Sequence, residues 1–207
     1  MTKNEKYPFS TPALRKELKH TFWLLDRVAS AKALAKLLSN DAAFMHHKIV
    51  IAAGDGRDLT EESEDFVSNE KSYDKVRKAI AENEYTITIS VGQLTTGVTI
   101  PEWSAVMMLS NVSSPALYMQ AAFRSQNSYH YEEKGKYYKK ENAYIFDFAP
   151  DRTLVMFDDF ANKLVGDGSA SDKERPENIK RLLNFFRCWY NANSWWRLQN
   201  RMDIYLF

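Results

Sequence analysis

Short apolar runs alternate along this chain with segments whose apolar residues recur at helical spacing. The apolar runs predict five buried strands, over residues 21–25, 48–56, 85–92, 104–110 and 143–148. Amphipathic spacing predicts helices over 30–40, 72–83, about 115–126 and 152–165. Short strands separated by helices favour a largely parallel sheet that is covered on both faces. We therefore expect an α/β fold.

The segments between these elements predict where a ligand would bind. Ser30 is placed to cap the helix over 30–40, and the acidic stretch 57–69 is typical of a loop. Glycines follow residues 53 and 91, and serines follow residue 109, each at the end of a predicted strand. Ligands of open parallel sheets lie at the carboxyl ends of the strands, so we expect function at this edge. Asp147, at the end of the last predicted strand, is expected to cap or to pair.

The C-terminal residues depart from the alternating pattern. Residues 166–178 resemble a linker, and "PENIKRLLNFF" predicts an amphipathic helix. Residues 188–207 then hold three of the chain's five tryptophans without a clean period. This tail is either an aromatic docking segment or a non-native end, and the helix before it favours the second interpretation. The predicted domains are an N-terminal extension over 1–19, one lobe over 20–166, and a linker, helix and tail over 167–207.

Composition limits the partners that the chain can attract. Of 207 residues, 44% are hydrophobic and 27% are charged, with a net charge of +1. No global field draws such a chain to an anion, so anion binding must come from local placement. The single cysteine, Cys188, excludes an internal disulfide and favours a reducing compartment. The polar N-terminus and the lack of a bilayer-length apolar run predict a cytoplasmic protein without a membrane partner.

Two segments contain candidate chemistry. In "GQLTTGVTIPEW" (92–103), the hydroxyls of Thr95 and Thr96 and nearby N–H groups suit phosphate oxygens, and Gly97 permits a sharp bend. In the helix over 115–126, Gln120 and Arg124 are spaced i, i+4 on one face, where a guanidinium can stabilise a transferring phosphoryl group. Taken alone, an ordinary turn and a solvated arginine explain these two segments better.

In order and spacing together, the two segments resemble motifs V and VI of the second RecA-like lobe of superfamily-two helicases and DNA translocases. "TTGVTIPEW", the strand "AVMMLS" and "YMQAAFRSQNS" look most like the motor subunits of type III and related restriction-modification enzymes. "HTFWLLDRVASAKALAKLL" is similar to motif IV, and the resemblance covers roughly residues 20–150. It implies a RecA-like three-layer sandwich with a mainly parallel sheet, followed by a C-terminal helical extension.

The resemblance also implies roles for individual residues. Arg124 would be the arginine finger that reaches the γ-phosphate of ATP, with Gln120 beside it in the catalytic site. Nucleotide would be bound by Gly97, Thr99, Gln120 and Arg124. The DNA backbone would be bound by Arg27, Ser30, Thr95 and Thr96, with N–H groups at the start of the motif IV helix holding a phosphate.

The chain departs from the family pattern at several places. Phe123 replaces the usual glycine, and Asn127 replaces the usual second arginine. No G-x-x-x-x-G-K-[ST] and no acidic magnesium box occur. We therefore expect ATP and Mg²⁺ to bind only together with a first RecA-like lobe, and the chain alone to be inactive as an ATPase. The implied partners are DNA, that N-terminal lobe, and methyltransferase or nuclease subunits.

Other interpretations remain open at this level. A degenerate lobe could serve as a DNA-binding or protein-docking module without catalysis, and a free-standing nucleotide-binding protein is disfavoured because no G-x-G-x-x-G follows a strand. His46 and His47 lack further ligands at metal-binding spacing, so no metal site is predicted. The basic, tyrosine-rich stretch contains Lys134, Lys136, Lys139 and Lys140, and it suits either nucleic-acid contact or a solvated hairpin-like loop.

Overall fold

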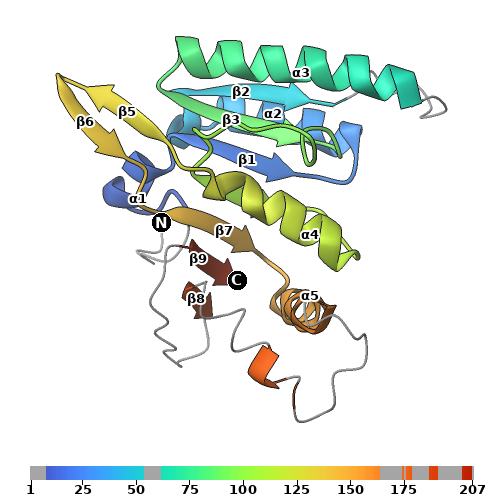
Figure 1. Cartoon of the computed structure of the whole chain (residues 1–207). Coiled ribbons are helices and arrows are strands. Elements are labelled where there is room, and N and C mark those ends of the chain that lie inside the picture. The colour runs from blue at the N-terminus through green and yellow to red at the C-terminus, as the bar shows by residue number, and fades with distance from the viewer. Residues whose placement is uncertain are drawn as a thin grey trace.

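A computed structural model describes residues 8–53, 62–163, 174, 176–178, 187–190 and 202–206 (Figure 1). Its main element is a sheet of seven strands in the order β2-β3-β1-β4-β7-β9-β8, and every neighbouring pair is parallel. These strands are β1 (His20–Leu24), β2 (His47–Ala52), β3 (Tyr85–Ser90), β4 (Ala105–Met108), β7 (Ala143–Asp147), β8 (Arg187–Tyr190) and β9 (Met202–Leu206). The expected α/β fold with a mainly parallel sheet is confirmed.

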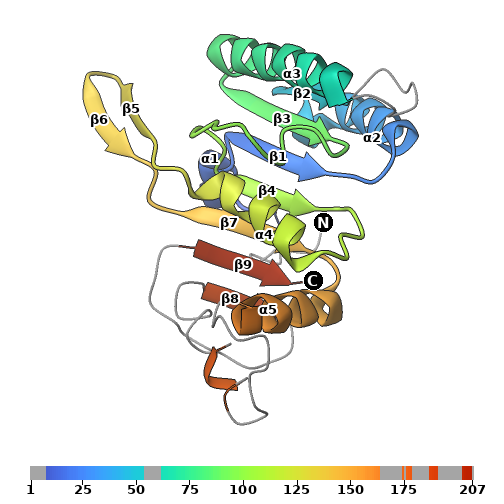
Figure 2. The same ribbon diagram turned by 45° about the vertical axis from the view of Figure 1, so that its right-hand side comes forward.

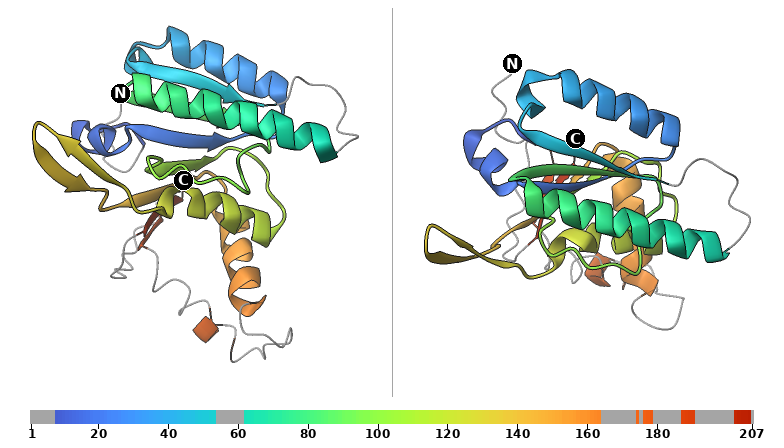
Figure 3. Two further views of the ribbon diagram at one scale, coloured as in Figure 1. Left: turned by 45° about the horizontal axis from the view of Figure 1, so that its top comes forward. Right: turned by 90° about the horizontal axis from the view of Figure 1, so that it is seen from above.

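Helices cover both faces of the sheet and make three layers. The helices are α1 (Pro12–Glu17), α2 (Val28–Asn40), α3 (Glu62–Glu82), α4 (Pro115–Ala122) and α5 (Pro150–Lys163). One core joins the sheet to α3, α4 and α5, and the other joins it to α1 and α2. Seen from above in Figure 3, α2 and α3 lie on opposite sides of the strands. This layering agrees with the expected RecA-like sandwich.

The central strands form because their side chains are apolar or β-branched on both faces. All residues of β4 and β7 are buried, as are five of the six residues of β3 (YTITIS). A strand that is covered on both faces reads as a continuous apolar run rather than an alternating one. These runs are the reason why the sequence located the first five strands of the sheet correctly.

One predicted helix start was wrong, and one predicted helix changes type before its end. Helix α2 begins at Val28 after the N-cap residue Arg27, which makes no side-chain capping bond, so Ser30 lies within the first turn and does not cap. The helix expected over 115–126 ends as an α-helix at Ala122, and residues Phe123–Gln126 form a 3₁₀ turn. The buried Ser125 hydroxyl donates to Ala122 O at 3.2 Å, which fits the tighter turn.

The predicted acidic loop was also wrong in part. Helix α3 begins at Glu62, so residues 62–69 are helical, while residues 57–61 lie outside the described residues. The basic, tyrosine-rich stretch forms an antiparallel hairpin of β5 (His130–Glu133) and β6 (Lys136–Lys139). Hairpin residues alternate between exposed and half-buried positions along β5, which gave no apolar run to detect.

The C-terminal part is only partly described. Residues 176–178 are helical, and residues 179–186 of the predicted helix lie outside the described residues. Within the aromatic tail, β9 pairs with β7 from Ala143↔Met202 to Asp147↔Leu206, and β8 pairs with β9. The tail thus adds strands to the sheet, which the sequence did not predict. Among the described residues, the helices are too short or too polar to cross a membrane.

Candidate functional site

The predicted DNA-contact residues lie at the carboxyl edge of the sheet. Strands β1 and β3 are neighbours, and Leu25 N donates to Ser90 O at 2.9 Å just beyond both strands. The start of α2 and the loop 91–104 therefore leave the sheet side by side. The side chains of Arg27, Ser30 and Thr96 are exposed, and that of Thr95 is half-buried.

The loop 91–104 begins with a tight, internally bonded turn. The Ser90 hydroxyl donates to Gln93 O, and the Thr95 hydroxyl donates to Gly92 O at 2.7 Å. Leu94 has a φ of 60° and a fully buried side chain, which fixes the turn to the core. Gly97 has a φ of 71°, so the expected bend at this glycine is present. The Thr95 hydroxyl thus stabilises the turn by this hydrogen bond.

Arg124 joins the loop 91–104 to the end of the α4 segment. Its Nε donates to Thr95 O at 2.7 Å, and its Nη1 donates to Val98 O. Burial lowers the pKa of Arg124, and among the described residues no carboxylate pairs with it. The structure therefore brings Arg124 next to Gly97 and Thr99, which flank Val98. The Arg124 guanidinium is therefore held by hydrogen bonds, but among the described residues no negative charge balances its positive charge.

Gln120 is placed differently from Arg124. It lies exposed on α4, while Arg124 follows in the 3₁₀ turn after the helix ends. The i, i+4 spacing therefore spans the change from α-helix to 3₁₀ turn. Figure 2 shows α4 lying across the strands, so that its first residues face the carboxyl edge and its last residues approach the amino edge. The backbone of the Arg124 turn thus lies toward the amino edge, while its side chain reaches back to Thr95 of the predicted DNA-contact segment.

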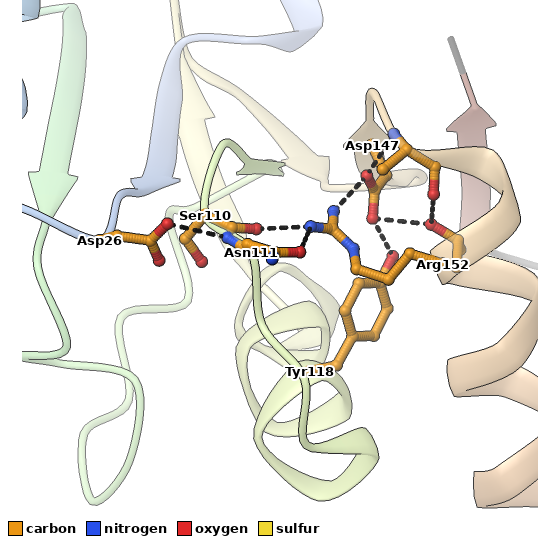
Figure 4. Close-up of polar contacts among 8 residues, drawn as sticks. Asp26, Ser110, Asn111, Tyr118, Asp147 and Arg152 are labelled. Carbon is orange, nitrogen blue, oxygen red and sulfur yellow. Dashed lines mark hydrogen bonds and ion pairs between the residues drawn. The ribbon is translucent and has the colours of Figure 1, made fainter.

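A buried polar network at the carboxyl edge was found mainly by the structure (Figure 4). Asp147, fully buried at the end of β7, accepts from Tyr118 Oη at 2.9 Å and from Thr153 Oγ1 at 2.7 Å. It also accepts from Arg152 Nη2 at 2.7 Å and from Ala149 N at 2.9 Å. The expectation that Asp147 caps or pairs is confirmed. Burial, and then the Asp147 charge, raise the pKa of Tyr118.

This network continues toward β1. Arg152 Nη1 donates to Ser110 O at 2.9 Å and to Asn111 Oδ1 at 3.0 Å, and Asn111 N donates to Asp26 Oδ2 at 3.0 Å. The connections that leave β1 and β4 run to opposite sides of the sheet, so the network lies at the topological switch point. The sequence feature that could have indicated this network is an aspartate at a strand end, Asp147, followed by Arg152 in the first turn of the next helix.

At the amino edge, Lys140 is held within the structure. Its Nζ donates to Pro101 O, Trp103 O and Ser125 O, each at 2.8 Å, and burial lowers its pKa to about 8. The other lysines of the hairpin are exposed. Of the neighbouring histidines His46 and His47, His47 packs against Phe9 and Phe44, and burial lowers the pKa of His47. Within the described residues, no cluster of metal-ligating side chains occurs.

The comparisons with known proteins link the chain to restriction-modification. No family model matches it. It is 29% identical over 145 residues to a Mycoplasma pneumoniae protein whose provisional name is type II restriction enzyme and methyltransferase, C-terminus. The match covers 70% of this chain and 19% of that protein, so the chain spans about a fifth of its relative's length. The chain is therefore a homologue, at modest identity, of a restriction-modification protein.

Proposed function

We propose that this chain is the second RecA-like lobe of an ATP-dependent DNA helicase or translocase that belongs to a restriction-modification enzyme. The observation that carries the proposal is the pair of hydrogen bonds from Arg124 to Thr95 O and Val98 O. They connect the segment that resembles motif VI to the segment that resembles motif V. The parallel α/β sheet and the likeness to a restriction-modification protein support the same assignment.

In this proposal two neighbouring groups of residues have different tasks. At the carboxyl edge, Arg27, Ser30 and Thr96 are exposed and suit the phosphates of a DNA strand, together with the uncapped N–H groups of α2. Arg124 and the neighbouring residues Gly97 and Thr99 suit the phosphates of ATP, with Gln120 exposed on α4. ATP would supply the phosphoryl group that is transferred to water, and its magnesium and remaining contacts would come from a first lobe.

The geometry suits a cation that acts in charge stabilisation. Neutral carbonyls position the Arg124 guanidinium but do not cancel its charge, so a phosphate brought to it by another lobe would meet a preorganised donor. The same carbonyls belong to the loop that carries Thr95 and Thr96. A shift of Arg124 toward nucleotide would therefore pull on the DNA-contact segment, which is how hydrolysis would be coupled to movement.

The test is DNA-stimulated ATP hydrolysis by the protein that contains both lobes. Arg124→Ala should lower the turnover by about 10³-fold or more, the range that arginine fingers contribute. Arg124→Lys keeps a charge but loses the planar fork, so it should recover little activity. Lys48→Ala, which removes an exposed cation on β2, is the matched control and should leave turnover unchanged. Undiminished turnover in Arg124→Ala would overturn the assignment.

A second candidate is a non-catalytic lobe that binds DNA or docks a protein partner. It is favoured by one observation: at the place of the usual second arginine, Asn127 Nδ2 donates at 3.3 Å to Arg124 O and so only stabilises the turn. This candidate predicts DNA binding without any DNA-stimulated ATP hydrolysis in the two-lobed protein. The unmutated protein in the same assay therefore separates the two functions.

A further inference from the structure

A cleft of about 840 Å³ lies at the amino edge of the sheet, between the β5–β6 hairpin and the body of the domain. Figure 1 shows the hairpin projecting from the body at this end of the strands. The cleft lies away from the Asp147 network and takes no part in the proposed function. Its walls combine aromatic rings with carboxylates, a combination that neither the DNA contacts nor the nucleotide contacts require.

One wall of the cleft is a stack of tyrosine rings. The ring centroids of Tyr129 and Tyr131 are 5.6 Å apart at an interplanar angle of 18°, and those of Tyr131 and Tyr138 are 5.5 Å apart at 19°. The Nζ of Lys19 already lies 5.9 Å from the centroid of Tyr131. The faces of stacked phenol rings attract cations and planar groups. This wall therefore suits a flat, positively charged ligand.

The cleft also contains a buried carboxylate with unused capacity. The Glu102 side chain is only 8% exposed. Its Oε1 accepts from Arg77 Nη1 at 2.5 Å, whereas its Oε2 is buried and has no hydrogen-bond partner among the described residues. A buried acceptor without a partner costs free energy, and the cost is larger for a charged group. A ligand that donates an N–H to Glu102 Oε2 would recover that cost.

The charge around the cleft excludes phosphates and favours cations. Seven glutamates line it against four lysines, and with Arg77, which is paired with Glu102 from outside the lining, the balance is −2. His20, also in the lining, does not offset this balance, because burial lowers its pKa to about 4. Lys19 is paired with Glu84 and Glu133, whereas Lys140 is bound to three backbone carbonyls, which leave its charge in this balance. A nucleic-acid backbone would meet net repulsion here.

We propose that this cleft binds the guanidinium group of an arginine side chain presented by a partner polypeptide. The planar guanidinium stacks on an end ring of the stack formed by Tyr129, Tyr131 and Tyr138, and donates an N–H to Glu102 Oε2. Arginine suits this site better than lysine, because its flat fork combines stacking with directed hydrogen bonds, whereas an ammonium group is a compact point charge. The inference stands on the cleft itself and does not depend on the ATPase assignment.

The experiment is an NMR titration of the ¹⁵N-labelled full chain with N-acetyl-arginine amide, and with the neutral analogue N-acetyl-citrulline amide. Addition of the arginine probe should shift the amides of residues 102–104, 129–131 and 138–140, while citrulline should bind at least about tenfold more weakly, a factor equal to one lost charge-assisted contact. Titration with (dT)₈ is the nucleic-acid arm. Shifts of the same amides by (dT)₈, equal to or stronger than those by arginine, would overturn the proposal.

Variants of the cleft test whether individual side chains bind arginine or only support the fold. Glu102→Gln removes the charge at the buried acceptor and should weaken arginine binding about tenfold, whereas Asp74→Asn, an exposed neutralisation on α3, should leave it unchanged. Tyr131→Leu, on the half-exposed wall, tests the stack without touching Glu102 and serves if Glu102→Gln does not fold. Equal binding of arginine by wild type and by either folded cleft variant would overturn the proposal, as would the absence of localised shifts.

Discussion

The two edges of the sheet treat charge in opposite ways. At the carboxyl edge, the buried Asp147 is paired with Arg152 and accepts four hydrogen bonds, so its charge is fully compensated. Toward the amino edge, Arg124 and Lys140 are bound by backbone carbonyls, and Glu102 keeps a buried oxygen without a partner among the described residues. Compensated charge holds a fold together, and uncompensated charge can bind something else. From this comparison we expect Asp147 and Arg152 to stabilise the fold, and Arg124 and Glu102 to bind ligands.

The largest change in stability is expected at the compensated edge. Asp147→Ala leaves Arg152, Tyr118 and Thr153 without their shared acceptor in a buried site, and should lower the free energy of unfolding by about 3–5 kcal/mol. Urea denaturation followed by circular dichroism measures this loss. Asp151→Ala, at an exposed position in the first turn of α5, is the control and should cost less than about 1 kcal/mol. A similar cost for both variants would contradict the contrast.

A pH dependence is expected from His20 at the amino edge. Burial lowers its folded pKa to about 4, below the ordinary value of 6.5. Between these two values the unfolded chain binds the proton and the folded chain does not. His20 therefore makes the free energy of unfolding fall as the pH drops from 6.5 toward 4, by up to about 1.4 kcal/mol per pH unit.

The measurement compares wild type with His20→Asn across this range of pH. The variant should lose that part of the slope, and the difference between the two proteins should be constant above about pH 7, where the imidazole is neutral in both states. An identical slope in both proteins between pH 6.5 and 4 would show that burial at this edge does not penalise charge.

A smaller effect is expected at Gly97, in the loop that connects the two edges. Its φ of 71° is strained for other residues, although no atom of the described residues lies within 4 Å of where a Cβ would stand. Gly97→Ala should therefore lower the free energy of unfolding by about 1–2 kcal/mol through backbone strain alone. Gly97→Asn should cost less, because asparagine adopts this conformation more readily. Equal costs, measured by thermal unfolding, would argue for a lost contact instead.

The smallest effect is expected for DNA affinity at a single exposed cation. Arg27→Ala should weaken binding of a duplex only a few-fold and reduce the slope of log affinity against log salt by about 1. Fluorescence anisotropy over a series of salt concentrations measures both quantities. Lys139→Ala, which removes an exposed cation at the amino edge, is the matched control. A larger loss for Lys139→Ala would move the DNA contacts to the hairpin.

The sequence predicted the framework of the fold because its strands are apolar on both faces. Continuous apolar runs located β1, β2, β3, β4 and β7. The prediction that Ser30 caps α2 was wrong, because the N-cap residue is Arg27, which makes no side-chain capping bond. The two hairpin strands were not predicted as strands, because their exposed and half-buried residues lack that apolar signal. The tail strands were not predicted either, because residues 188–207 show no clean period.

Candidate residues were predicted less completely than the strands. The pairing of Asp147 could be foreseen from its place at a strand end, but its partners Tyr118 and Thr153 come from other elements. Glu102 reads as an ordinary acidic residue in a turn, and only the packing of Arg77 and the hairpin around it makes it a buried, half-used acceptor. Burial of a polar group is a property of tertiary neighbours, which local patterns do not encode.

The loop 91–104 has a mechanical consequence. It is tied near its start by the Ser90 hydroxyl of β3, which donates to Gln93 O, in its middle by Arg124, which donates to Val98 O, and near its end by Lys140, which donates to Pro101 O. A segment held at three points is expected to move as one rigid unit rather than to open as a flexible loop. Strain applied at one margin of the domain would therefore be felt at the other without any intermediate unfolding.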